Sequence, residues 1–214
     1  MKTNQNPDFF TIGGVCGIIG TISYIIAITF TFSPALSFLL AMAWPILSII
    51  FAFSVYKYIS IQKQSISNQL AFIFTVIAFV LVSIMISVQI IVRAGMEESI
   101  ISATGSKKDT LLLVSSSLRW IDLGVDLAWD MFLGLALFLL SMAIKEHQEF
   151  GIWWSIPLVL LALVLVVTNL ITFPDPPNTK GIFDVGPIIG IFIIVFAVRV
   201  IYLGRKMRNL SNLN

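Results

Sequence analysis

Residues 121–144 read IDLGVDLAWDMFLGLALFLLSMAI, an apolar run that carries aspartates at positions 122, 126 and 130. A helix of about 20 apolar residues is long enough to cross the hydrocarbon core of a bilayer. A charged side chain at the centre of that core costs roughly 2.5 to 3.5 kcal/mol, so three carboxyl groups require partners or a function. The segment therefore predicts a membrane-spanning helix with a cluster of polar residues near its N-terminal end.

The rest of the chain has the composition of a membrane protein. Hydrophobic residues make up 58% of the 214 residues and charged residues 11%, whereas soluble domains have roughly 45–50% and 25%. We predict six spans, near residues 10–31, 36–56, 70–92, 121–144, 152–173 and 185–203. The expected fold is an all-α integral membrane bundle, a single transmembrane domain over residues 1–214 with the lipid bilayer as its partner. A net charge of +2 gives no reason to expect a nucleic-acid partner.

The positive residues predict the orientation of the bundle, because Lys and Arg in short loops stay on the cytoplasmic side. With six spans both termini share one side, which carries Lys2, Lys57, Lys63, Lys145, Arg205, Lys206 and Arg208; the other side carries Arg93, Lys107, Lys108, Arg119 and Lys180. This excess predicts a multi-pass protein of the cell membrane with cytoplasmic termini. We expect Arg199, in the last span, to extend its guanidinium to the same interface.

Two connections on the outer side have distinct patterns. Between spans three and four, Leu111, Val114, Leu118 and Ile121 recur at helical spacing, which predicts a short helix lying along the membrane interface. Residues 173–187 are rich in proline and glycine, which predicts a stiff cap over the bundle. That cap carries Asp175 and Asp184.

The three aspartates of the fourth span share one helix face. Four residues advance a helix by about 40° beyond a full turn and by about 6 Å, so Asp122, Asp126 and Asp130 occupy an arc of about 80°. We expect Asp122 to lie in the first helical turn and to stabilise the positive end of the helix dipole. Asp126 and Asp130 lie deeper, where a carboxyl group must face protein or water.

The candidate site is predicted from polar residues that lie at similar depths in the membrane on different spans. Gln89 and Arg93 lie near the outer end of span three, and Asn169 lies about one turn below the outer end of span five. With Asp126 and Asp130 they could form an outward-facing acidic pocket that binds or transports a cation, a proton or a small polar ligand. The other interpretation is that Arg93 and Arg119 pair with the acids and lock the bundle.

Two further function classes stay open. One is a non-catalytic assembly or regulatory membrane protein, in which the acids are structural pairs. The other is a lipid-modifying enzyme that uses aspartates to hold a divalent metal on a diphosphate, although no second aspartate-rich helix is present. We predict no catalytic residue and no cofactor, and whether a metal binds is open. Cys16 is the only cysteine, and His147 is expected to be a solvated loop residue.

Three motifs occur together in the C-terminal half: Asp122-Leu-Gly-Val-Asp126-Leu-Ala-Trp-Asp130-Met-Phe-Leu-Gly134, Phe173-Pro-Asp-Pro-Pro177 and Gly181-Ile-Phe-Asp-Val-Gly-Pro187. In combination they resemble a group of small bacterial six-span membrane proteins of unknown function. The resemblance implies a six-helix bundle in a bacterial inner membrane. It assigns no activity and no catalytic or binding residue.

Overall fold

The computed structural model is a bundle of long helices, and it describes residues 7–175, 177–181 and 185–211. Lys2 and Asp184 lie outside these residues. Six helices are long and apolar enough to cross a membrane, so the predicted all-α six-span fold is confirmed and the chain is a multi-pass membrane protein. The elements are α1 (Pro7–Thr29), α2 (Pro34–Gln62), α3 (Ile66–Ser87), the π-helix η1 (Val88–Val92), α4 (Arg93–Ser102), α5 (Gly105–Ile144), α6 (Gly151–Thr172), the 3-10 helix η2 (Pro177–Lys180) and α7 (Gly186–Ser211).

The short connections are set by local capping. Ser33 precedes α2, and its hydroxyl accepts the backbone N–H of Leu36 at 3.4 Å, while Pro34 occupies the first helical position. Ser65 caps α3 in the same way through the N–H of Asn68, at 3.2 Å. These side chains accept backbone donors that have no partner within the helix. Tight antiparallel turns between α1 and α2 and between α2 and α3 follow.

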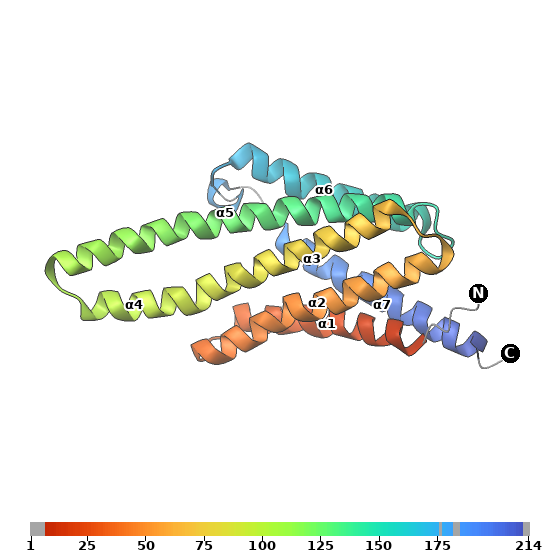
Figure 1. Ribbon diagram of the computed structural model, residues 1–214, viewed down its shortest axis with the longest axis horizontal. Coiled ribbons are helices and arrows are strands. Elements are labelled where there is room, and N and C mark those ends of the chain that lie inside the picture. The colour runs from red at the N-terminus through yellow and green to blue at the C-terminus, as the bar shows by residue number, and fades with distance from the viewer. Residues whose placement is uncertain (1–6, 176, 182–184, 212–214) are drawn as a thin grey trace.

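The spans are arranged as a ring. Helix α1 packs against α2 and α7, α3 packs against α2 and α5, and α5 packs against α6, which gives the order α7, α1, α2, α3, α5, α6. Side chains close the ring between α6 and α7, where the rings of Trp154 and Phe196 have centroids 5.5 Å apart. Both termini lie at one end of the bundle (Figure 1), as an even number of spans requires. Arg208 and Asp8 form a 3.2 Å ion pair between α7 and α1 at that end. The interior of the ring is bounded by all six spans.

Glycines let α1 approach its two neighbours closely. A Cβ at Gly13 would lie 2.2 Å from the hydroxyl oxygen of Ser54 on α2, and one at Gly17 would lie 2.9 Å from the ring of Phe51. On another face, a Cβ at Gly14 would lie 2.8 Å from the carbonyl oxygen of Ala197 on α7. The Gly-x-x-x-Gly spacing of Gly13 and Gly17 therefore serves packing within the chain.

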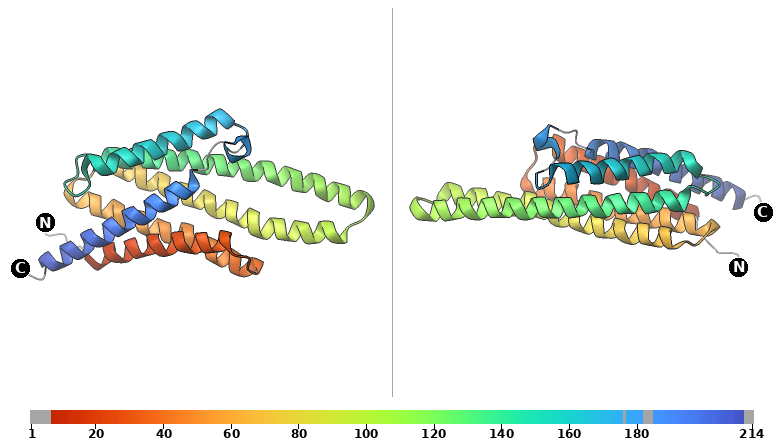
Figure 2. Two further views of the ribbon diagram at one scale, coloured as in Figure 1. Left: turned by 180° about the vertical axis from the view of Figure 1, so that it is seen from behind. Right: turned by 90° about the horizontal axis from the view of Figure 1, so that it is seen from above.

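Helices α3, α4 and α5 form a hairpin that extends beyond the other helices (Figures 1 and 2). Its arms are the continuous helical segments Ile66–Ser102, 37 residues, and Gly105–Ile144, 40 residues. At about 1.5 Å per residue each arm is nearly twice as long as the roughly 30 Å hydrocarbon core is thick. The arms are therefore longer than one membrane crossing requires, and the hairpin end, residues 93–121, is the part that extends beyond the other helices.

This hairpin corrects the prediction for residues 93–120. The segment around Leu111 and Leu118 is helical, as predicted, but it is not a separate interfacial helix, because α5 runs without a break from Gly105 to Ile144. No proline interrupts those residues, and the polar side chains there lower the hydropathy without ending the helix.

Candidate functional site

Asp122 is a buried acid with two side-chain partners from the other arm of the hairpin. Its side chain is only 5% exposed, and its carboxylate accepts a 2.7 Å hydrogen bond from the guanidinium of Arg93. The amide nitrogen of Gln89 donates to the same carboxylate at 3.2 Å. The predicted role of Asp122 as a first-turn residue is wrong, because α5 begins at Gly105 and places Asp122 in the helix interior. Asp122 instead joins the two hairpin arms.

The two donors to Asp122 come from the π-helical segment. Gln89 lies within η1 and Arg93 follows directly after it. A π-helix has a wider turn than an α-helix and is often found at functional sites. Here it is the place where the third span continues into α4, and both side chains reach one carboxyl group. The predicted pocket groups Gln89 and Arg93 with Asp126 and Asp130; the structure pairs both residues with Asp122, as the alternative interpretation predicts for Arg93, and Gln89 also lines a cavity with the deeper acids.

Asp130 lies deeper and has an uncharged partner. The amide nitrogen of Asn169 donates to its carboxylate at 2.7 Å and also to the carbonyl oxygen of Leu165 at 2.9 Å. Asp130 and Asn169 are 6% and 7% exposed. The structure therefore brings together this predicted pair from α5 and α6. The amide fixes the position of the carboxyl group.

Asp126 lies between these two acids on α5. It lines a small cleft with Leu123, Asn169 and Pro174, below the connection after α6. Asp175 of that connection forms a 2.8 Å ion pair with Lys180. Asp184, the other acid predicted in the cap, lies outside the described residues.

Asp126 and Asp130 are among the residues that line a large central cavity. Its volume is about 600 Å³, and side chains from all six spans line it. The polar and aromatic part of the lining consists of Thr21, Tyr24, Trp44, Gln89, Asp126, Trp129, Asp130, Thr168 and Asn169. No lysine, arginine or histidine occurs among the described lining residues. Gln89 and Asn169 thus border the same space as the two deeper acids, whereas Arg93 does not line it.

The cavity has an aromatic wall that sequence analysis missed. The rings of Tyr24 and Trp44 have centroids 4.4 Å apart, and Trp44 meets Trp129 edge to face with centroids at 6.2 Å. These residues belong to α1, α2 and α5. Helical periodicity predicts that Trp129 shares the helix face of the aspartates, but it does not identify Trp129 as part of a site. Tyr24 and Trp44 lie far away in the sequence, and only the ring order of the helices brings them to the acids.

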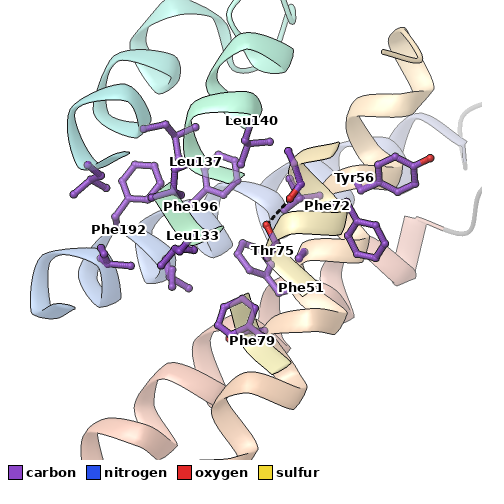
Figure 3. Close-up of a pocket in the computed structure, with 18 of the residues that line it drawn as sticks. Phe51, Tyr56, Phe72, Thr75, Phe79, Leu133, Leu137, Leu140, Phe192 and Phe196 are labelled. Atoms are coloured by element: carbon purple, nitrogen blue, oxygen red, sulfur yellow. Dashed lines mark hydrogen bonds between the residues drawn. The ribbon is translucent and has the colours of Figure 1, made fainter. Parts of the chain in front are cut away.

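A second, apolar cavity lies towards the end with the termini (Figure 3). Its volume is about 80 Å³, and Phe51, Phe72, Leu137 and Phe196 are among its lining residues. The two cavities share Ile189 of α7 as a wall, and this residue packs with Leu133 and Leu165 in one hydrophobic cluster. This apolar layer separates the acidic cavity from the end with the termini.

The polar residues at that end form a network. His147 is 8% exposed, so its predicted place as a solvated residue is wrong; its ring packs on Tyr58 and Phe150, with centroids at 5.6 and 5.3 Å. Burial lowers the pKa of His147, an effect that Glu149 partly opposes.

Glu149 pairs with Arg199 at 3.2 Å and Lys206 at 2.6 Å. Its pKa is lowered, chiefly by the hydrogen bond from Lys206. The network fixes the loop after α5 to α7.

The acids are not arranged as a typical metal centre. Within the described part of the chain, no three His, Cys, Asp or Glu side chains converge on a point where they could hold a metal ion. A hard divalent cation needs about six oxygen ligands, whereas Asp126 and Asp130 are set in a wall that is largely apolar. The arrangement lends no support to a metal-dependent lipid-modifying enzyme.

Comparison with known proteins adds no functional assignment: no family model, curated protein or solved structure matches this chain.

Proposed function

We propose that this protein binds a small cation in its central cavity, for recognition or transport. The observation that carries the proposal is that Asp126 and Asp130 line a cavity of about 600 Å³. Cavities of roughly 300 to 1,000 Å³ accommodate small molecules. Acidic side chains inside a membrane segment cost free energy, and a cationic ligand offsets that cost.

The pairing of Arg93 supports a structural role for one of the three acids, Asp122. Arg93 is engaged by Asp122, outside the cavity, at 2.7 Å. The interpretation that arginines lock the bundle therefore accounts for Asp122, which does not line the cavity. Asn169 positions the Asp130 carboxylate, as a binding site requires of a group that must hold its orientation.

The proposed setting is a bacterial inner membrane with cytoplasmic termini. The excess of Lys and Arg at the end with the termini supports this orientation, as does the resemblance to small bacterial six-span proteins. In that orientation the acidic cavity lies in the outer half of the membrane. The apolar layer around Leu133 and Ile189 then closes it from the cytoplasmic side.

The test is reconstitution into liposomes with imposed pH and cation gradients. The native chain is compared with Asp126→Asn, Asp130→Asn and the control Asp109→Asn, which alters an exposed acid in the same helix. Cation-dependent flux or binding that is lost in the first two variants and kept in the control supports the function. Equal behaviour of all four proteins contradicts it.

An assembly function is the second candidate, and the long hairpin favours it. Residues 93–121 extend beyond the other helices, and Ile101 and Leu113 there are 82% and 69% exposed. Such an arm could contact another protein outside the membrane. Removing the tip while keeping the Arg93–Asp122 pair would abolish complex formation under this alternative and would leave cation binding unchanged.

A further inference from the structure

The composition of the cavity wall distinguishes between classes of cation. Apolar side chains such as Ile25, Met85, Leu165 and Ile189 form most of the lining, and oxygen-bearing side chains form the smaller part of it. An inorganic ion that leaves water needs oxygen ligands around it to replace its hydration shell. This largely apolar wall supplies few of them.

An organic cation matches such a wall better. Its charged nitrogen can sit beside the carboxylates, while its apolar body displaces water from the rest of the cavity. The rings of Tyr24, Trp44 and Trp129 border the same space. Indole and phenol faces attract cations, and this attraction is larger away from bulk water.

We propose that the ligand of this cavity is an organic ammonium ion with an apolar body, bound through its nitrogen by Asp126 and Asp130 and through its body by the aromatic wall. This inference rests on the proposed function, because it specifies the cation of the same site. It adds a requirement that the general proposal lacks: both the positive charge and the hydrophobic body contribute to affinity.

The test uses the purified full-length protein in lipid nanodiscs and isothermal titration calorimetry. The probe is 2-phenylethylammonium chloride, and its neutral counterpart is 2-phenylethanol, which has the same body with a hydroxyl in place of the ammonium group. Sodium, potassium and calcium chlorides form the inorganic arm. We expect saturable binding of the ammonium probe and at least tenfold weaker binding of the alcohol.

Matched variants locate the site. Asp130→Asn should weaken binding of the ammonium probe about tenfold or more, and Trp129→Leu about fivefold. The controls Asp109→Asn and Trp120→Leu change exposed residues of the same helix and should bind as the native chain does. If Asp130→Asn does not fold, Asp126→Asn and the comparison of the two probes on the native chain carry the test.

The possible failures are distinguishable. Saturable binding of an inorganic ion that depends on Asp130 and that 2-phenylethylammonium does not displace overturns the organic-cation inference and keeps the proposed function. Equal affinity for the ammonium probe and the alcohol also overturns the inference. Absence of saturable binding for every cation overturns both.

Discussion

The guanidinium of Arg93 and the carboxylate of Asp122 form a 2.7 Å ion pair between residues 29 positions apart, on opposite arms of the long hairpin. The carboxylate is buried and the guanidinium is half exposed. Gln89 donates to the same carboxylate and also lines the central cavity. The pair therefore sets the register of the two arms next to the cavity wall.

Breaking this pair should destabilise the protein. We expect Arg93→Ala to cost about 1 to 3 kcal/mol, because it leaves the buried Asp122 carboxylate without its charged partner. Asp122→Ala should cost less, because the Arg93 guanidinium that it leaves is half exposed. The double variant should cost less than the two single variants together. Unfolding in detergent micelles, followed by tryptophan fluorescence, measures these costs.

As a control, Lys180→Ala breaks the exposed pair with Asp175 and should cost under about 1 kcal/mol. Strictly additive costs for Arg93 and Asp122 would show that the two residues do not interact.

Close packing of α1 on α7 predicts a large effect at Gly14. A Cβ there would meet the backbone of Ala197 and the side chain of Ile201, at 2.8 and 2.5 Å, so Gly14→Ala should destabilise the bundle by roughly 1 to 3 kcal/mol. Gly124→Ala is the matched control, because no atom lies within 4 Å of the added Cβ. It should stabilise α5 by up to about 1 kcal/mol. The melting temperatures of the two variants should move in opposite directions, and a shift in the same direction would argue against this helix packing.

Acid should destabilise the loop between α5 and α6. Burial lowers the pKa of His147 below its ordinary value of 6.5, so the unfolded chain binds more protons than the folded chain between the two pKa values. Stability is therefore lost as the pH falls below about 6.5. The pKa of Glu149 is lowered from its ordinary value of 4.5, so a second loss follows below about pH 4.5.

Replacing His147 isolates the first of these effects. His147→Asn removes the only histidine of the chain and should flatten the dependence of the free energy of unfolding on pH just below 6.5. The loss attributed to Glu149 should remain. The free energy of unfolding, measured at several pH values between 4 and 8, tests this. If its dependence on pH is the same in the variant, a group other than His147 causes the effect.

The orientation can be measured with single cysteines. In a Cys16→Ser background, Ser106→Cys reports on the hairpin tip and Glu146→Cys reports on the loop at the end with the termini; both positions are exposed. Cytoplasmic termini predict that a membrane-impermeant maleimide labels position 106 and not position 146 in intact cells. The reverse labelling would place the acidic cavity on the cytoplasmic side.

The spans could be predicted because each depends on a local property. A run of about 20 apolar residues can satisfy its backbone hydrogen bonds in a bilayer only as a helix, whatever its neighbours are. The start of α5 could not be found in this way, because hydropathy falls at residues 105–120 while helix propensity does not. For the same reason, Asp122 was placed in the first helical turn when it lies well inside the helix.

The candidate site was predictable only in part. The shared face of Asp126, Trp129 and Asp130 follows from helical periodicity, and depth in the membrane indicated Asn169 as a residue near Asp130. Depth did not specify which acid Arg93 would join, since several acids lie within reach of a long side chain. His147 was misplaced because its polar sequence neighbours gave no sign of the aromatic residues that bury it.

The sequence by itself determined a six-span helical membrane protein with a line of carboxyl groups on one helix, because hydropathy and periodicity act over a single helix. Only the tertiary structure decided that Asp122 is paired by Arg93 while Asp126 and Asp130 border a cavity beside Tyr24 and Trp44. That outcome depends on the order of the helices around the ring, which arises from close contacts such as Gly13 on Ser54 and Gly14 on Ala197. These contacts join residues far apart in the chain, and no local pattern encodes them.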